Sequence, residues 1–152
     1  MSSALVDLAR NPRAFTAYKN DPSAREAILN ETIRRALPEV LLDRFTTEPL
    51  EIHGMTIPTG AKIRFILGAA LRDPQVFPNP DEFDWERPRE ASMALAFGLG
   101  THNCAGQAIA RATATAVLDV ITERFDRVEV VGEPEWVLSD RHRNCEGLTV
   151  RL

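Results

Sequence analysis

Cys104 is the side chain of this 152-residue sequence whose type and position best suit chemistry. It stands between a glycine-rich stretch, residues 97–103, and an alanine-rich segment, residues 107–124, that predicts the longest helix of the chain. A helix N-terminus presents unpaired N–H groups and a partial positive charge, which stabilise an ionised sulfur. Such a sulfur is a metal ligand or a nucleophile.

The residues around the cysteine favour a bulky, flat partner. Gly98, Gly100 and Gly106 allow the backbone to turn tightly and to approach such a group without collisions from Cβ atoms. His102 can present an N–H or a positive charge to an anionic group next to it. The stretch therefore indicates a loop that lies against a ligand.

Other roles for the cysteine remain open at this level. A free cysteine is most often a small buried hydrophobic residue. Two Cys and three His, scattered along the chain, show no paired zinc-ligand spacing, and no histidine is identified as the base of a cysteine hydrolase. A dinucleotide-binding fingerprint is excluded because Asn103 stands where its third glycine would be.

The N-terminal third, about residues 3–37, predicts helices. Ser2 or Ser3 is expected to cap the first of them. The longest helix of this part begins at Asp21, which is followed by proline at the first helical position. Pro38 ends it, because the residue before a proline is disfavoured in helical conformation.

The rest of the chain predicts an α+β class, mainly helical with small antiparallel β-sheets, in a single domain over residues 1–152. Apolar residues alternate in a small sheet at about 50–71. A proline-rich, packed irregular loop is expected at about 73–96. After the loop 97–106 and the helix 107–124, the C-terminal segment 128–152 is expected to contain two short strands, at residues 128–131 and 148–152.

Composition narrows the classes of partner. The chain has 18 Lys+Arg against 22 Asp+Glu, a net charge of −4, and no basic stripe, so nucleic acid is not an expected partner. Its longest apolar run, residues 65–71, is far below the roughly 18 residues that a membrane span requires. No signal-like segment follows Met1, so we expect a cytoplasmic protein with two unpaired cysteines.

Two motifs carry a resemblance to a known family. The run Phe97-Gly98-Leu99-Gly100-Thr101-His102-Asn103-Cys104-Ala105-Gly106, followed by Ala110-Arg111, resembles the haem-binding signature of the cytochrome P-450 family. Glu31-Thr32-Ile33-Arg34 resembles the Glu-x-x-Arg pair of the family's K helix, at the proper distance upstream. The resemblance covers nearly the whole chain. It implies the C-terminal, haem-binding half of the cytochrome P-450 fold, bacterial type, from the J and K helices onward.

The resemblance also implies roles for individual residues. Cys104 would be the proximal thiolate ligand of the iron of haem b, iron protoporphyrin IX. Phe97 would pack beside the sulfur, and His102 and Arg44 would contact haem propionates. The full set of cofactor-binding residues that it implies is Phe97, Gly98, Gly100, His102, Cys104, Gly106 and Arg44.

A structural network is implied as well, in which Glu31 and Arg34 join Arg87 to hold the proximal loop. Helical periodicity alone gives a different interpretation. It places Glu31 and Arg34 opposite the apolar side of their helix, as a solvated i,i+3 pair of little energetic value.

The implied function is that of an oxidoreductase, a monooxygenase that inserts oxygen from O2 into a small organic substrate with electrons from a ferredoxin or flavoprotein. In the family, the I helix and most of the substrate pocket precede the matched part. We therefore expect an exposed apolar face, covered by a complementary N-terminal chain or by a second copy. Catalysis by this chain alone stays open, and a haem-free, partner-binding scaffold and a truncated relic are the alternatives.

Overall fold

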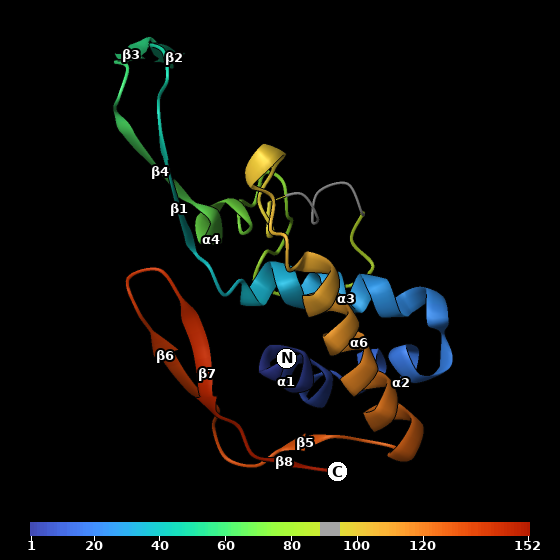
Figure 1. The fold of residues 1–152 in the computed structure, drawn as a ribbon. Coiled ribbons are helices and arrows are strands. Elements are labelled where there is room, and N and C mark those ends of the chain that lie inside the picture. The colour runs from blue at the N-terminus through green and yellow to red at the C-terminus, as the bar shows by residue number, and fades with distance from the viewer. Residues whose placement is uncertain (89–94) are drawn as a thin grey trace.

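Four helices form the base of the fold in the computed structural model, which describes residues 1–88 and 95–152 (Figure 1). They are α1 (Ser2–Arg10), α2 (Pro12–Asn20), α3 (Pro22–Ala36) and α6 (Gln107–Arg124). At the start of α3 the Asp21 carboxylate accepts a hydrogen bond from the Ser23 backbone N–H at 2.9 Å, as expected of an N-cap. The expected serine cap of α1 is wrong, because Ser2 is already helical and Met1 holds the cap position without a side-chain hydrogen bond.

The main core lies where α6 crosses α2 and α3 (Figure 1). Leu118 of α6, Tyr18 of α2 and Ile28 of α3 are almost completely buried there. This packing fixes the start of α6, and with it the cysteine loop, relative to α3.

Tyr18 offers a direct probe of this core, since it is the single tyrosine of the sequence. Its hydroxyl donates to Asp119 Oδ1 at 3.2 Å. Burial, reinforced by the negative charge of Asp119, raises the pKa of Tyr18 to about 12. Folding therefore holds the phenol neutral. The raised pKa of Tyr18 adds to the free energy of unfolding. This contribution is complete below about pH 10, the ordinary pKa of tyrosine, and is lost as the pH rises toward about 12.

We expect phenolate absorbance of the native protein to develop near pH 12 and that of the urea-unfolded chain near pH 10. A native titration midpoint equal to the unfolded one would contradict this burial.

A two-stranded ladder rises from the end of α3 (Figure 1). It pairs β1 (Leu41–Phe45) with β4 (Lys62–Ile66), and its far end carries the hairpin of β2 (Leu50–Ile52) and β3 (Met55–Ile57). The hairpin turn places His53 and Gly54 at φ values of 49° and 77°, the left-handed geometry that a two-residue turn requires.

The expected sheet boundary, about 50–71, is wrong at both ends. It omits β1, whose sequence Leu-Leu-Asp-Arg-Phe does not alternate apolar and polar residues. It also includes residues 67–70, which form the short helix α4 (Leu67–Ala70). Leu67 turns inward there to join a second core with Leu37, Leu71 and Phe77.

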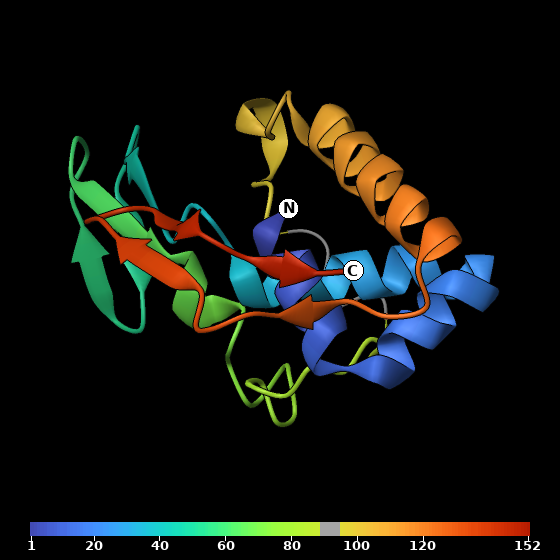
Figure 2. The ribbon, with the colours of Figure 1, turned by 90° about the horizontal axis from the view of Figure 1, so that it is seen from below.

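The C-terminal region contains two antiparallel pairs (Figure 2). The outer pair joins β5 (Glu129–Val130) to β8 (Val150–Arg151), within the segments expected to be strands. Between them lies a hairpin of β6 (Glu135–Leu138) and β7 (Arg143–Gly147), which the sequence did not indicate. The tip of this hairpin pairs with the residues just before β1, where the Val40 N–H donates to the Arg141 carbonyl at 2.8 Å.

Residues 71–88 form turns and bends without a regular element, as the proline content predicts. The expected loop at 73–96 extends into residues 89–94, which lie outside the described part of the chain. Among the described helices, none combines the length and apolarity needed to cross a bilayer.

Candidate functional site

The cysteine loop is held in shape by its own backbone. Gly98 and Gly100 have φ values of 75° and 73°, which a residue with a Cβ adopts only with strain. A short 3₁₀ turn, η1 (Gly100–His102), follows, and the Cys104 N–H then donates to the Phe97 carbonyl at 2.8 Å. The loop therefore closes on itself just before α6 and leaves the Cys104 thiol exposed.

A cavity of about 350 Å³ opens beside this thiol. The cysteine loop contributes Phe97, Gly98, His102 and Cys104 to its lining. The opposite wall comes from the turn after α3, from β1 and from α4, and is made of Pro38, Glu39, Leu42 and Leu67. The cavity is thus walled by apolar side chains with a thiol, an imidazole and one carboxylate among them.

Three expected cofactor residues lie apart from this lining. Gly106 stands behind the thiol, where an added Cβ would lie 3.8 Å from Cys104 Sγ. Gly100 is at the start of η1. Arg44 is on β1, where its Nη1 donates to the Asp43 carbonyl at 2.8 Å, and it is not among the described residues that line the cavity.

Sequence reasoning assigned no role to Glu39 and His142, which the fold brings together. His142 Nε2 lies 2.6 Å from Glu39 Oε2, at the bridge between the β6–β7 tip and the start of β1. The two residues are far apart in sequence, and no motif links them. Glu39, which lines the cavity, is therefore held in an ion pair with a residue of the β6–β7 hairpin tip.

Arg111 connects the loop to α3. Its Nη1 donates to Asn30 Oδ1 at 2.6 Å, and its guanidinium carbon lies 5.1 Å from the centre of the Phe97 ring. Burial lowers the pKa of Arg111 from its ordinary value, but a guanidinium remains charged at neutral pH. Arg111 thus fixes the aromatic ring that precedes the cysteine.

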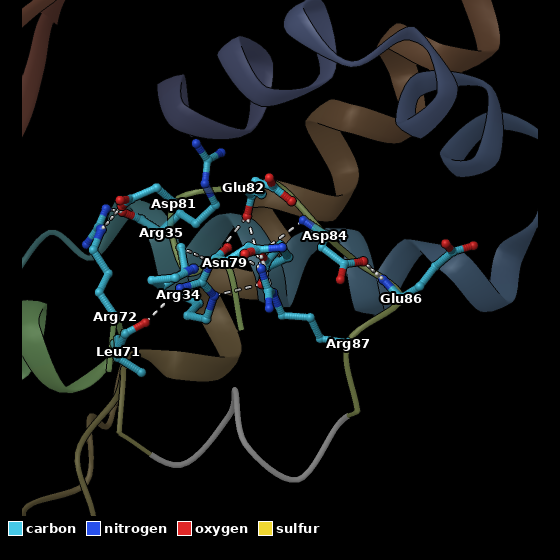
Figure 3. A network of polar contacts seen from close by, with 12 residues as sticks. Arg34, Arg35, Leu71, Arg72, Asn79, Asp81, Glu82, Asp84, Glu86 and Arg87 are labelled. Atoms are coloured by element: carbon cyan, nitrogen blue, oxygen red, sulfur yellow. Dashed lines mark hydrogen bonds and ion pairs between the residues drawn. The ribbon is translucent and has the colours of Figure 1, made fainter. Parts of the chain in front are cut away.

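A buried network of charges lies on the other side of α3 (Figure 3). Arg34 and Glu31, with side chains 0% and 2% exposed, form two parallel hydrogen bonds, each of 2.8 Å. Arg34 Nη1 also donates to the Leu71 carbonyl and Nη2 to the Pro80 carbonyl, both at 2.7 Å. Arg87 Nε donates to Glu31 Oε1 at 3.2 Å. The structure thus brings Glu31, Arg34 and Arg87 together.

The interpretation of Glu31 and Arg34 as a solvated pair is wrong for a clear reason. Residues 71–88 fold over the polar side of α3, and their backbone carbonyls accept from further N–H groups of Arg34. The Asp84 N–H likewise donates to Glu31 Oε1 at 3.1 Å. Helical periodicity contains no information about this covering loop.

Comparison with known sequences finds relatives of this chain in a single protein family. Residues 25–139 match the profile of the family described as "Cytochrome P450". Cytochrome p450 CYP199A2 of Rhodopseudomonas palustris is 32% identical over 152 residues, which are 100% of this chain and 36% of that protein. Cytochrome P450 107B1 of Saccharopolyspora erythraea is 34% identical over 99% of this chain and 38% of its own length. The chain therefore spans a little over a third of these relatives.

Solved structures of cytochromes P450 agree with this family assignment. CYP108D1 of Novosphingobium aromaticivorans superposes with a TM-score of 0.89 at 35% identity, over 99% of this chain and 36% of that one. P450BioI, solved in complex with an acyl carrier protein ligated to hexadec-9Z-enoic acid, has a TM-score of 0.87 at 29% identity. The match covers 99% of this chain and 39% of P450BioI. The expected α+β class and the cytochrome P450 fold are confirmed. This chain belongs to the cytochrome P450 family.

Proposed function

We propose that this chain is the haem-binding part of a monooxygenase, an oxidoreductase in which Cys104 Sγ is the axial ligand of the iron of haem b. The observation that carries the proposal is the exposed thiol at the wall of an apolar cavity of about 350 Å³. Membership of the family implies a haem cofactor. The b type and the individual ligands are part of the proposal.

The residues around the cavity fit a flat, largely apolar group with an anionic edge. Phe97 and Leu42 offer apolar surface, and the left-handed turn at Gly98 carries no Cβ that would keep a flat group from the backbone. His102 lines the same cavity and supplies an N–H for a carboxylate at the edge of that group. Together these features suit a porphyrin.

In this proposal the protein orients and electronically tunes the sulfur. The Cys104 N–H is already bonded to the Phe97 carbonyl, so the loop positions the thiol before any ligand arrives. Arg111 holds the Phe97 ring in place through its contact with Asn30. A thiolate-ligated haem supplies oxygen activation, because the electron-rich sulfur favours cleavage of the O–O bond.

The network of Glu31, Arg34 and Arg87 has a positioning role. It ties residues 71–88 to α3. Further along the chain, Leu95 and Ala96 pack against the second core immediately before the cysteine loop. A rigid supporting shell of this kind is what a precisely placed ligand requires.

The full activity needs partners. The proposed reaction inserts one oxygen atom of O2 into a small organic substrate and reduces the other to water, with two protons from solvent and two electrons from a ferredoxin or flavoprotein in the cytoplasm. The exposed side of α6 carries Ile109, Val117 and Val120, which are 73%, 37% and 46% exposed. We infer that a complementary N-terminal part of a P450 chain, supplied in the same or a separate polypeptide, covers this face, with a second copy of this chain as the alternative.

Haem titration tests the function. The full chain is mixed with haemin, reduced and exposed to carbon monoxide, with and without the N-terminal part of a related P450. We expect one haem per chain and the red-shifted ferrous–carbonyl band typical of thiolate ligation. A chain that is folded by circular dichroism yet leaves haemin with its free spectrum under both conditions contradicts the proposal.

A further inference from the structure

A second cavity, of about 120 Å³, is lined by residues of α1, α3 and the β6–β7 hairpin. Four arginines line it, Arg10 of α1, Arg35 at the end of α3, Arg72 after α4, and Arg143 of β7. We call it the arginine pocket. It shares no lining residue with the cavity beside Cys104, so the proposed haem site does not account for it.

The charges of the arginine pocket are poorly balanced. Among its described lining residues, Asp7 is the one acid against four guanidinium groups, in a chain whose net charge is −4. Glu133 and Asp81 pair with Arg10 and Arg72, but their side chains are 89% and 87% exposed and lie outside the lining. Exposed pairs of this kind offset little of the local positive potential.

Two of the arginines retain unused donors. Arg143 lies with its guanidinium carbon 4.1 Å from the centre of the Trp136 ring, and its side chain has no hydrogen bond or ion pair to any described residue. Arg35 donates from Nη1 to Asp7 Oδ1 at 2.6 Å, but its buried Nε has no hydrogen-bond partner within the described part of the chain. That Nε is closed to solvent, so the donors that the cavity offers to an anion come from Arg143 and from the guanidinium ends of the other arginines.

The electrostatic environment of Arg143 agrees with this description. Its pKa is lowered first by burial and then by the positive charges of Arg72 and Arg35, with Asp7 opposing the shift. The arginines therefore repel one another across the cavity. An anion between them would relieve that repulsion.

We propose that the arginine pocket binds a small oxyanion of the phosphate class. The planar N–H fork of arginine matches phosphate oxygens, and several forks around one cavity suit a dianion better than a single negative charge. Stacking on Trp136 holds Arg143 in position before the anion arrives. The pocket would accept free phosphate or the phosphate group of a larger molecule.

Calorimetric titration of the full chain with inorganic phosphate tests the proposal, with sodium chloride at matched ionic strength as the reference. We expect saturable binding of one phosphate per chain. Arg143→Gln removes a charged donor and is expected to weaken binding by about tenfold or more. Asp7→Asn removes the competing carboxylate, keeps an oxygen that accepts from Arg35, and is expected to tighten binding severalfold.

Arg127→Gln is the matched control, because Arg127 is 76% exposed and does not line the pocket. Should Arg143→Gln fail to fold, phosphate binding is measured with Arg10→Gln instead, which is expected to weaken it too. The Arg10 side chain is 56% exposed, so its loss leaves the core intact. The absence of phosphate binding overturns the proposal, and so does an equal loss in the control. Acetate binding as tightly as phosphate would overturn the phosphate assignment. Because the readout needs no haem, its failure leaves the proposed function untouched.

Discussion

Replacing Cys104 with alanine is expected to abolish the thiolate-type ferrous–carbonyl band of the haem-loaded chain. The sulfur is the single thiol that lines the cavity among the described residues, and no other soft ligand stands beside it. Haem that still enters the cavity would then show the spectrum of a ligand other than thiolate, or of none. The effect is close to all-or-none, because it removes the coordinating atom itself.

The stability of this variant separates ligation from folding. Cys104 is exposed, so truncation of its side chain leaves no internal cavity and should change the free energy of unfolding by no more than about 0.5 kcal/mol. Unfolding in urea, followed by circular dichroism, checks this. A spectral loss without a stability loss assigns the effect to the bond between sulfur and iron.

Cys145→Ala is the matched control. Cys145 is a half-buried free thiol on β7, opposite Trp136, and its Sγ donates to the Gly147 carbonyl at 3.4 Å. It does not line the cavity beside Cys104. The control should therefore keep the thiolate band. Retention of the band in Cys104→Ala, or its loss in Cys145→Ala, would rule out the proposed ligand.

Local signals in the sequence predicted the elements that position this loop. Asp21 with the following proline starts α3, Pro38 ends it, and alanine content marks α6 at Gln107–Arg124. These signals act within a few residues, so they can be read without the fold. The positive φ values at Gly98 and Gly100 also agree with the expectation that glycine is needed there.

The features that sequence could not supply depend on contacts between distant segments. β1 forms because β4 pairs with it, and the β6–β7 hairpin places His142 beside Glu39. Likewise, the burial of Arg34 follows from residues 71–88, whose course proline content alone does not determine. Pairing and covering of this kind override local propensity. The family resemblance supplied the missing information for Glu31, Arg34 and Arg87.

Arg34 is expected to be among the most destabilising positions of the chain. Its guanidinium is completely buried and bonds both oxygens of Glu31 and the carbonyls of Leu71 and Pro80. Arg34→Met would leave the buried Glu31 with Arg87 and the Asp84 N–H as its remaining partners. Removing one partner of a buried ion pair costs about 3–5 kcal/mol, a large fraction of the stability of an ordinary domain.

Urea unfolding of Arg34→Met against Arg13→Met measures this difference. Arg13 pairs with Glu86 at the surface, where the two side chains are 76% and 63% exposed, and such a pair contributes about 0–1 kcal/mol. Combining Arg34→Met with Glu31→Gln should cost less than the sum of the two single changes, because each single change leaves the other's charge without its main partner. Equal losses in Arg34→Met and Arg13→Met, or strict additivity in the double variant, would mean that the network does not hold residues 71–88 on α3. The cysteine loop would then owe its position to Arg111 and the main core alone.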